Sequence, residues 1–178
     1  MVATSKMKKA QDSAKSGRPY ALLLADIIVS IADEFLEVTN DYFMERPVKH
    51  RGILVIGTDK GLCGALNSNL FRILSEVDSS AKFVAIGKRA TQYLSRTRRD
   101  LLADFSLPDK PSFSDVKKVV EFLLRNYNDG NIDTIEVLYT GFINTLRQEP
   151  ELIPLFPLND LDEMSAKLHE LFGIEDHE

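Results

Sequence analysis

The sequence predicts an α/β fold, in which a parallel sheet is flanked by helices and preceded by a long N-terminal helix. Two observations lead to this prediction. Short apolar runs of strand length alternate with segments of helical period, and a longer helical stripe precedes the first run. Strands that alternate with helices form parallel sheets through right-handed crossovers. With 178 residues, of which 44% are apolar, the chain is long enough for one domain and an appendage.

The predicted N-terminal helix contains an apolar stripe in residues 20–43. Its members recur at spacings of three and four, so they share one face of a helix. They are Leu24, Ile27, Ile28, Ile31, Phe35, Val38 and Tyr42. Gly17-Arg18-Pro19 comes before the stripe and on its own would mark a break or a kink. The stripe must pack against the α/β domain or against another helix.

After Pro47 strands and helices alternate. The expected strands are Gly52–Gly57, Lys82–Gly87 and Thr134–Thr140. Residues 151–158 are expected to add a strand at the sheet margin, because their prolines cannot donate to a central ladder. The expected helices are Ala65–Val77, Lys88–Ser95, Asp115–Tyr127 and Leu161–Phe172.

The helix Asp115–Tyr127 has the clearest boundary signals. Ser114 is its expected N-cap, and Asn128-Asp129-Gly130 is its expected stop. Its inner face is expected to be apolar. The residues of that face are Val116, Val119, Val120, Leu123 and Leu124.

The segment from Gly57 to Asn69 is the strongest candidate for function, because three glycines join a buried strand to a helix there. It lacks the Walker pattern, since Lys60 precedes the second glycine. It also lacks the dinucleotide fingerprint, because Asp59 stands in place of the first glycine and would repel a pyrophosphate. We therefore favour glycines that permit positive φ or close packing of helix on strand. Phosphate binding is the alternative.

Other candidate chemistry is sparse. Cys63, the only cysteine, excludes an internal disulfide and is expected to be a packed loop residue rather than a nucleophile. His50, His169 and His177 lack metal-ligand spacing. Asp59 and Lys60 fit a salt bridge to a partner better than an acid–base pair. Residues 87–89 form either a solvated basic turn or an anion site at a helix start. We therefore expect no catalytic residue, no cofactor and no metal.

The net charge of −5 is unevenly distributed, with a basic segment in residues 1–18 and an acidic one in the last twenty residues. No aromatic residue alternates with the basic ones, and the acidic body would repel a duplex, so no nucleic-acid partner is expected. The longest apolar run, residues 21–32, contains Asp26 and is too short to cross a bilayer.

Several segments resemble the gamma subunit of F-type ATP synthases. The Asp59–Gly64 segment reads DKGLCG and is followed by Asn67 and Asn69, as in that family's signature. Residues 1–11, MVATSKMKKAQ, are similar to the family's N-terminal helix, and Arg18-Pro19-Tyr20 also fits. Phe142-Ile143-Asn144-Thr145, followed by Gln148 and Pro150, resembles a segment late in the family's central domain. The matches occur in the family's order and span residues 1 to 158.

The resemblance implies a non-catalytic rotor that couples rotation to ATP synthesis and hydrolysis in a proton-translocating enzyme. It implies three parts. Residues 1–46 would form a long N-terminal shaft helix, which is half of an antiparallel coiled coil. Residues 47–158 would form a Rossmann-like central domain without a nucleotide, and residues 159–178 would form an acidic segment. The chain is expected to start inside the N-terminal helix and to lack the family's C-terminal helix. The apolar stripe would then lose part of its partner, which predicts self-association.

The implied partners are the alpha, beta and epsilon subunits and the membrane c-ring, at the cytoplasmic face of a bacterial inner membrane. The implied contact residues of the shaft are Met1, Lys6, Met7, Lys8 and Lys9. Those expected to approach the C-terminal region of beta are Lys60, Gly61, Leu62, Cys63 and Gly64. Two alternatives stay open: a stand-alone α/β module that binds a nucleotide or phosphate with the 57–64 loop, and a non-rotary interaction module related to gamma.

Overall fold

The computed structural model describes residues 4–5, 7–12, 42, 44–60, 65–108, 110–144, 146–158 and 161–172. The chain divides into two compact units. Unit 1 comprises Met1–Met44, Phe142–Arg147 and Leu158–Glu178, and unit 2 comprises Glu45–Gly141 and Gln148–Pro157.

Unit 2 is built on a five-stranded sheet with the order β3-β2-β1-β4-β5. Its strands are β1 (Gly52–Ile56), β2 (Lys82–Ile86), β3 (Asp100–Phe105), β4 (Ile135–Asn144) and β5 (Arg147–Phe156). Strand β1 pairs in parallel with both β2 and β4, and β2 pairs in parallel with β3. The α/β class and the three central strands confirm the prediction.

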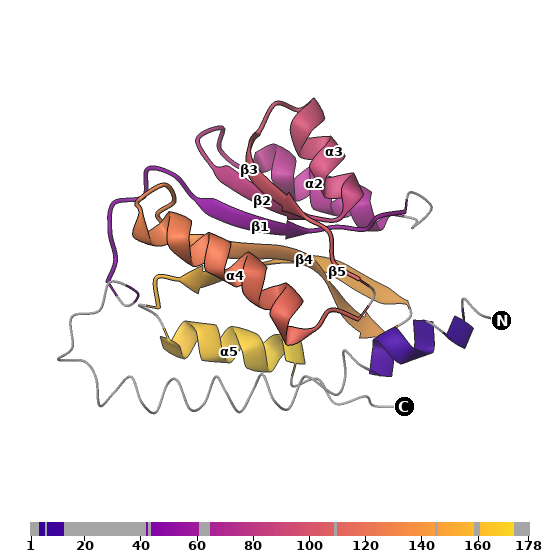
Figure 1. Ribbon diagram of the computed structural model, residues 1–178. Coiled ribbons are helices and arrows are strands. Elements are labelled where there is room, and N and C mark those ends of the chain that lie inside the picture. Colours follow the sequence, from indigo (N-terminus) through magenta and orange to yellow (C-terminus); the bar gives the residue numbers. More distant parts are fainter. Residues whose placement is uncertain are drawn as a thin grey trace. The chain divides into compact units, whose positions relative to one another are not determined.

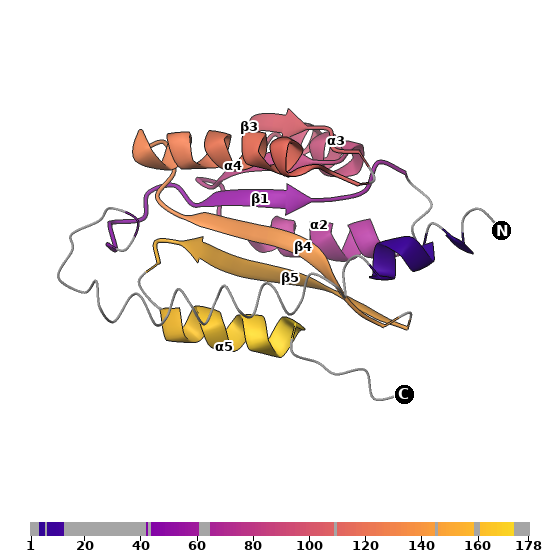
Figure 2. The same cartoon turned by 60° about the horizontal axis from the view of Figure 1, so that its bottom comes forward.

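The predicted parallel sheet is confirmed for β3, β2, β1 and β4, but β5 makes the whole sheet mixed. Only residues 145 and 146 separate β4 from β5, which is too short for a crossover, so β5 returns antiparallel to β4. Figure 2 shows β5 running opposite to β1. The expected position of β5 at the margin is confirmed, and its prolines, Pro150 and Pro154, fit an edge strand.

Helices cover both faces of the sheet in unit 2. On one face lie α2 (Leu66–Glu76) and α3 (Lys88–Arg96), and α4 (Phe113–Asn128) crosses the other face (Figure 1). This arrangement follows from right-handed crossovers, because the connections β1-α2-β2 and β2-α3-β3 run in one direction along the sheet and the connection through α4 runs back. The rings of Phe71 and Tyr93 stack at 4.2 Å between α2 and α3.

The N-cap of α4 is Ser112 rather than the expected Ser114. The Ser112 hydroxyl accepts the N–H of Asp115, and the Asp115 carboxylate accepts the N–H of Ser112. This reciprocal capping box requires an acceptor three residues after the cap, which Ser112 has and Ser114 lacks, because Lys117 stands there. The predicted stop is confirmed: Gly130 has a φ of 76° and donates its N–H to the carbonyl of Tyr127.

The main core of unit 2 lies between the sheet and the helices α2 and α3. Ile53 and Val55 of β1 point to this side and pack with Leu70, Leu74 and Leu94. Strand alternation turns the buried Leu54 to the opposite face, which α4 covers. The buried residues of α4 are Val119, Leu123 and Tyr127.

Two residues of the expected inner face of α4 are therefore misplaced. Val116 and Val120 are 42% and 44% exposed. The buried residues Val119, Leu123 and Tyr127 recur every four positions, so the helix meets the sheet along a narrow line. Val116 and Val120 lie on the flank of that line. The pattern of apolar residues predicted the helix correctly but overestimated the width of its buried face.

Unit 1 contains a helical segment in residues 7–12, α5 (Leu161–Phe172) and the tip of the β4–β5 hairpin. The bounds of α5 agree with the predicted acidic helix, and Asp162 and Glu163 in its first turn complement the helix dipole. Of the predicted stripe in residues 20–43, Tyr42 is described and lies in a turn; its other members lie outside the described residues. Among the described helices, none has the length and apolar character needed to cross a membrane.

Candidate partner-contact loop at the carboxyl ends of the strands

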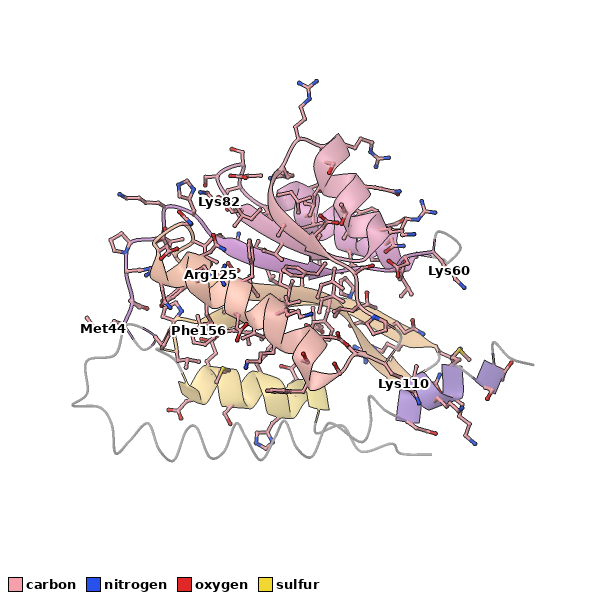
Figure 3. All side chains as sticks on the ribbon, viewed as in Figure 1. Met44, Lys60, Lys82, Lys110, Arg125 and Phe156 are labelled. Atoms are coloured by element: carbon pink, nitrogen blue, oxygen red, sulfur yellow. The ribbon has the colours of Figure 1, made fainter. Side chains whose placement is uncertain are left out.

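The segment Gly57–Lys60 leaves the carboxyl end of β1, next to the boundary between β1 and β4 where the strand order reverses. Open α/β sheets place their ligand loops at such a switch point. Figure 3 shows Lys60 at the opposite end of the strands from Lys82, which begins β2. The loop that the sequence singles out is therefore where a functional loop is expected in this fold.

The two ends of this loop are joined by Thr58 and Asn67. The side-chain amide of Asn67 donates to the Thr58 hydroxyl oxygen at 2.8 Å, and the Thr58 N–H donates to the Asn67 carbonyl oxygen at 3.4 Å. The Thr58 hydroxyl in turn donates to the carbonyl of Lys60 at 2.7 Å. Asn67 belongs to the first turn of α2, so these bonds fix the start of that helix to the end of β1. The loop has a closed base made by its own polar side chains.

Asp59 occupies the N-terminus of α3. One of its carboxylate oxygens accepts the N–H of Lys88 at 3.0 Å, and the Thr58 carbonyl accepts the N–H of Arg89 at 3.0 Å. These N–H groups at a helix N-terminus are the donors that would bind a phosphate. A carboxylate and a carbonyl of the chain already fill them, while the Lys88 and Arg89 side chains are exposed. These contacts therefore favour the interpretation of residues 87–89 as a solvated basic turn over their interpretation as an anion site.

Close packing explains two glycines around this loop. A Cβ on Gly57 would lie 3.1 Å from the Cβ of Ala90, so glycine lets α3 approach the end of β1. Gly87 has a φ of 95°, and a Cβ there would lie 2.5 Å from the carbonyl oxygen of Gly57. For Gly57, the structure confirms the expected packing of helix on strand. Gly61 and Gly64 lie outside the described residues.

The predicted contact residues are distributed over both units. Lys60 is exposed in unit 2, and Met7, Lys8 and Lys9 are exposed on the helical segment of unit 1. The remaining predicted contacts lie outside the described residues. They are Met1, Lys6, Gly61, Leu62, Cys63 and Gly64. In the part of the chain that the structure describes, no group of three or more His, Cys, Asp or Glu residues is placed to hold a metal ion.

A second polar cluster, at the amino ends of the strands, was missed by the sequence analysis. Two acidic residues of this region, Asp133 and Glu136, are only 8% and 9% exposed. Arg51 makes a two-pronged contact with Glu136, at 3.0 Å from Nε and 2.7 Å from Nη2, and also pairs with Asp78 at 3.3 Å. The hydrogen bond to Glu136 is the main cause of the raised pKa of Arg51.

The Asp133 carboxylate is held in its charged form. Burial alone would raise its pKa, but the N–H groups of His50 and Lys49 and the charge of Arg46 outweigh burial, so its pKa lies below the ordinary value. The N–H donors lie 2.8 Å and 2.9 Å from Oδ2. No periodic pattern marks Asp133, because its partners lie more than 80 positions earlier in the sequence.

Comparison with known proteins decides which family these features belong to. The family model described as ATP synthase matches residues 1–178. The chain belongs to this ATP synthase family. Its curated relatives carry the gamma-chain name, so the predicted resemblance to the gamma subunit is confirmed.

Curated relatives are called ATP synthase gamma chain. The protein from Opitutus terrae is 44% identical over 98% of this chain and 59% of its own length. The protein from Methylococcus capsulatus is 36% identical over 94% of this chain and 61% of its own length. The protein from Desulfitobacterium hafniense is 33% identical over 93% of this chain and 60% of its own length. The chain thus spans about three fifths of these gamma chains.

Solved structures of ATP synthases share the fold. The Tetrahymena thermophila mitochondrial ATP synthase central stalk and c-ring contains a chain with a TM-score of 0.64 and 21% identity, matched over all of this chain and 76% of its own length. The Euglena gracilis mitochondrial ATP synthase contains one with a TM-score of 0.53 and 17% identity, covering 90% of this chain and 56% of its own. At these identities the likeness shows the fold alone.

Proposed function

We propose that this chain acts as the gamma subunit of a proton-translocating F-type ATP synthase, the central rotor that couples rotation to ATP synthesis and hydrolysis. The observation that carries the proposal is the match of residues 1–178 to the family, with curated gamma chains up to 44% identical. The subunit has no catalytic site of its own. It acts with the alpha, beta and epsilon subunits and the membrane c-ring, at the cytoplasmic face of a bacterial inner membrane.

The proposed division of labour follows the order of the chain. Residues 1–46 form a long shaft helix, residues 47–158 form the Rossmann-like domain, and residues 159–178 form an acidic segment. Met1, Lys6 and residues 7–9 face the hexamer, and residues 60–64 approach the C-terminal region of beta. Because each beta site has a different contact energy with each face of gamma, the orientation of gamma selects which site is open.

The geometry around the 57–64 loop supports presentation to a protein more than phosphate binding. Asp59 fills the N-terminus of α3, where a phosphate would bind, and its negative charge would repel one. The bonds between Thr58 and Asn67 join the described residues on either side of positions 61–64. Such a base suits a loop that must keep its position against a partner.

Reconstitution with alpha and beta subunits tests the proposal. We expect co-purification at one copy per hexamer together with a changed rate of ATP hydrolysis. Association without any effect on hydrolysis would favour the non-rotary interaction module. No association, together with saturable ATP or phosphate binding that Gly61→Val abolishes, would overturn the proposal in favour of the stand-alone binding module.

A matched pair of charge reversals tests the loop itself. Lys60→Glu should weaken association with the hexamer, because it reverses an exposed charge beside the closed base of the loop. Lys118→Glu reverses an exposed lysine on α4 and should leave association unchanged. Equal effects of the two variants would indicate that net charge, rather than the loop, controls binding.

A further inference from the structure

The outer face of α3 carries three cations and no acidic side chain. The helix reads KRATQYLSR, and the exposed residues of its outer face are Lys88, Arg89, Gln92, Ser95 and Arg96. Figure 1 shows α3 beside α2 on one face of the sheet. Because the whole chain has a net charge of −5, this helix is a basic surface on an acidic protein.

The stability of the fold does not account for Lys88 and Arg89. Both lie in the first turn of α3, which has no acidic residue, and the helix dipole disfavours cations there. In the part of the chain that the structure describes, no ion pair involves Lys88, Arg89 or Arg96. Cations that oppose the helix dipole without an evident gain in stability indicate a role outside the fold.

The three cations lie along one side of the helix. Lys88, Gln92 and Arg96 follow one another at intervals of four, so they form a row of about 12 Å. Arg89 lies next to this row, because it precedes Gln92 by three positions. The surface is therefore long enough to contact several side chains of a partner at once.

Arg96 is positioned by an aromatic pair. Its guanidinium carbon lies 5.9 Å from the centre of the Tyr93 ring, within the range of a cation–π interaction. The Tyr93 ring stacks on Phe71 of α2 at 4.2 Å, and the Tyr93 hydroxyl donates to the Phe71 carbonyl at 3.3 Å. The pair fixes α3 to α2 and restrains one cation of the surface before a partner binds, which lowers the entropic cost of binding.

The chemistry of this surface favours carboxylates over phosphates. Phosphate sites at helix N-termini use backbone N–H groups. Here the Asp59 carboxylate and the Thr58 carbonyl already accept the N–H groups of Lys88 and Arg89. Side-chain cations remain, and clusters of these recognise acidic segments of proteins without backbone donors.

We propose that the outer face of α3 is a docking surface for an acidic segment of a protein partner, with Lys88, Arg89 and Arg96 as its cations. The surface includes none of the contact residues of the rotor proposal, which lie at positions 1, 6–9 and 60–64. Its contribution is electrostatic, so it speeds encounter, orients the partner and is weakened by salt. The proposal is independent of the rotor function, because it requires only a partner with this charge pattern.

A fluorescent poly-L-glutamate peptide tests the surface in the full chain. Anisotropy at low salt should show saturable binding, although the net charge of −5 would repel this probe from a chain without a basic surface. Arg89→Glu should weaken binding about fivefold or more, because it removes one exposed ion pair and adds a repulsion. The control, Lys118→Glu, makes the same charge change on α4, at the other face of the sheet, and should leave binding nearly unchanged.

Stability measurements separate docking from a structural role. A glutamate in the first turn of α3 complements the helix dipole, so Arg89→Glu should keep or raise the free energy of unfolding while it weakens binding. Gln92→Lys adds a fourth cation to the row and should strengthen binding about twofold or more. If Arg89→Glu lost stability together with binding, or if Gln92→Lys did not strengthen binding, the proposal would be overturned.

Further variants and probes separate other sources of binding. Lys8 and Lys9 are also exposed, so a chain with Lys8→Glu and Lys9→Glu measures the share of the N-terminal segment. The proposal fails if this chain loses binding that Arg89→Glu keeps, or if Lys118→Glu weakens binding as much as Arg89→Glu. Phosphatidylglycerol vesicles and duplex DNA present phosphates instead of carboxylates. Tighter binding of either than of poly-L-glutamate, lost in Arg89→Glu, would overturn the acidic protein partner.

Discussion

Replacing Gly87 with alanine tests whether the close approach between the end of β1 and the start of α3 leaves no room for a side chain. The new Cβ would lie 2.5 Å from the carbonyl oxygen of Gly57 and 3.2 Å from that of Thr58, both of which are backbone atoms. The φ of 95° is also unfavourable for any residue with a side chain. Both effects act at the N-terminus of α3, so the bond from Lys88 to Asp59 should lengthen as the backbone moves.

The magnitude follows from these two contributions. The φ of 95° and ψ of 142° at Gly87 lie in a region that is essentially reserved for glycine and costs another residue about 1–3 kcal/mol, and forcing the backbone to shift adds about 1–3 kcal/mol. Gly87→Ala should therefore lower the free energy of unfolding by about 2–6 kcal/mol. Gly130→Ala is the matched control, because its φ is 76° and a Cβ there would meet nothing within 4 Å. It should show only the cost of a positive φ, about 1–2 kcal/mol.

Urea unfolding of the two variants and the parent chain measures both values. The difference between Gly87→Ala and Gly130→Ala measures the cost of the contact with Gly57 together with that of the less favourable ψ at Gly87. If the two variants lose equal stability, the close approach of α3 to β1 does not constrain the fold. The explanation of Gly57 and Gly87 as packing glycines would then fail.

Three further predictions concern caps and charge. Ser112→Ala should lower the free energy of unfolding, measured by thermal unfolding, by about 1 kcal/mol, whereas Ser114→Ala should change it by less than about 0.5 kcal/mol. A larger loss in Ser114→Ala than in Ser112→Ala would refute the assignment of Ser112 as the cap. Asp59→Ala should remove the acceptor at the N-terminus of α3 and lower the free energy of unfolding, measured in urea, by about 1 kcal/mol. Asp59→Asn should lower it by less. Equal stability of Asp59→Ala and the parent chain would contradict the bond between Asp59 and Lys88. The pKa of Asp133 is lowered from 3.8 in the fold, so its stabilising contribution is present above that value and is lost as the pH falls through the folded pKa. Below about pH 4, the free energy of unfolding should therefore fall less steeply with decreasing pH in Asp133→Asn than in the parent chain. The same pH dependence in both chains would refute the role of Asp133.

The sequence predicted the elements whose signals are local. Strands β1, β2 and β4 are apolar runs, and α5 has a clear helical period with acidic residues in its first turn. Strand β3 was missed because Asp100–Phe105 is half-exposed and has no regular alternation. Its position depends on pairing with β2, which periodicity cannot reveal. The narrow buried line of α4 likewise depends on how the helix meets the sheet.

The sequence located the candidate loop, but it did not reveal the hydrogen bonds that hold the loop in place. The glycines and Asp59 marked the segment, and the missing phosphate templates argued against an anion. The bond from Lys88 to Asp59 joins residues 29 positions apart, so only the sheet brings them together. The contacts of Arg46 with Tyr127 and Asp133 span still longer separations. Such contacts follow from topology, which a single sequence specifies only through its elements.

The signature residues of the gamma-chain family therefore divide into two physical roles in this chain. Asp59 and Asn67 face inward, to α3 and to Thr58, and hold the base of the loop. The Lys60 side chain is exposed, although its carbonyl accepts the Thr58 hydroxyl in that base. An inward role predicts loss of stability on substitution, whereas an outward role predicts loss of partner binding at unchanged stability. Comparing Asp59→Ala with Lys60→Glu in both assays separates these roles. If Lys60→Glu left association with the hexamer unchanged, the proposed contact of the loop with beta would lose its basis.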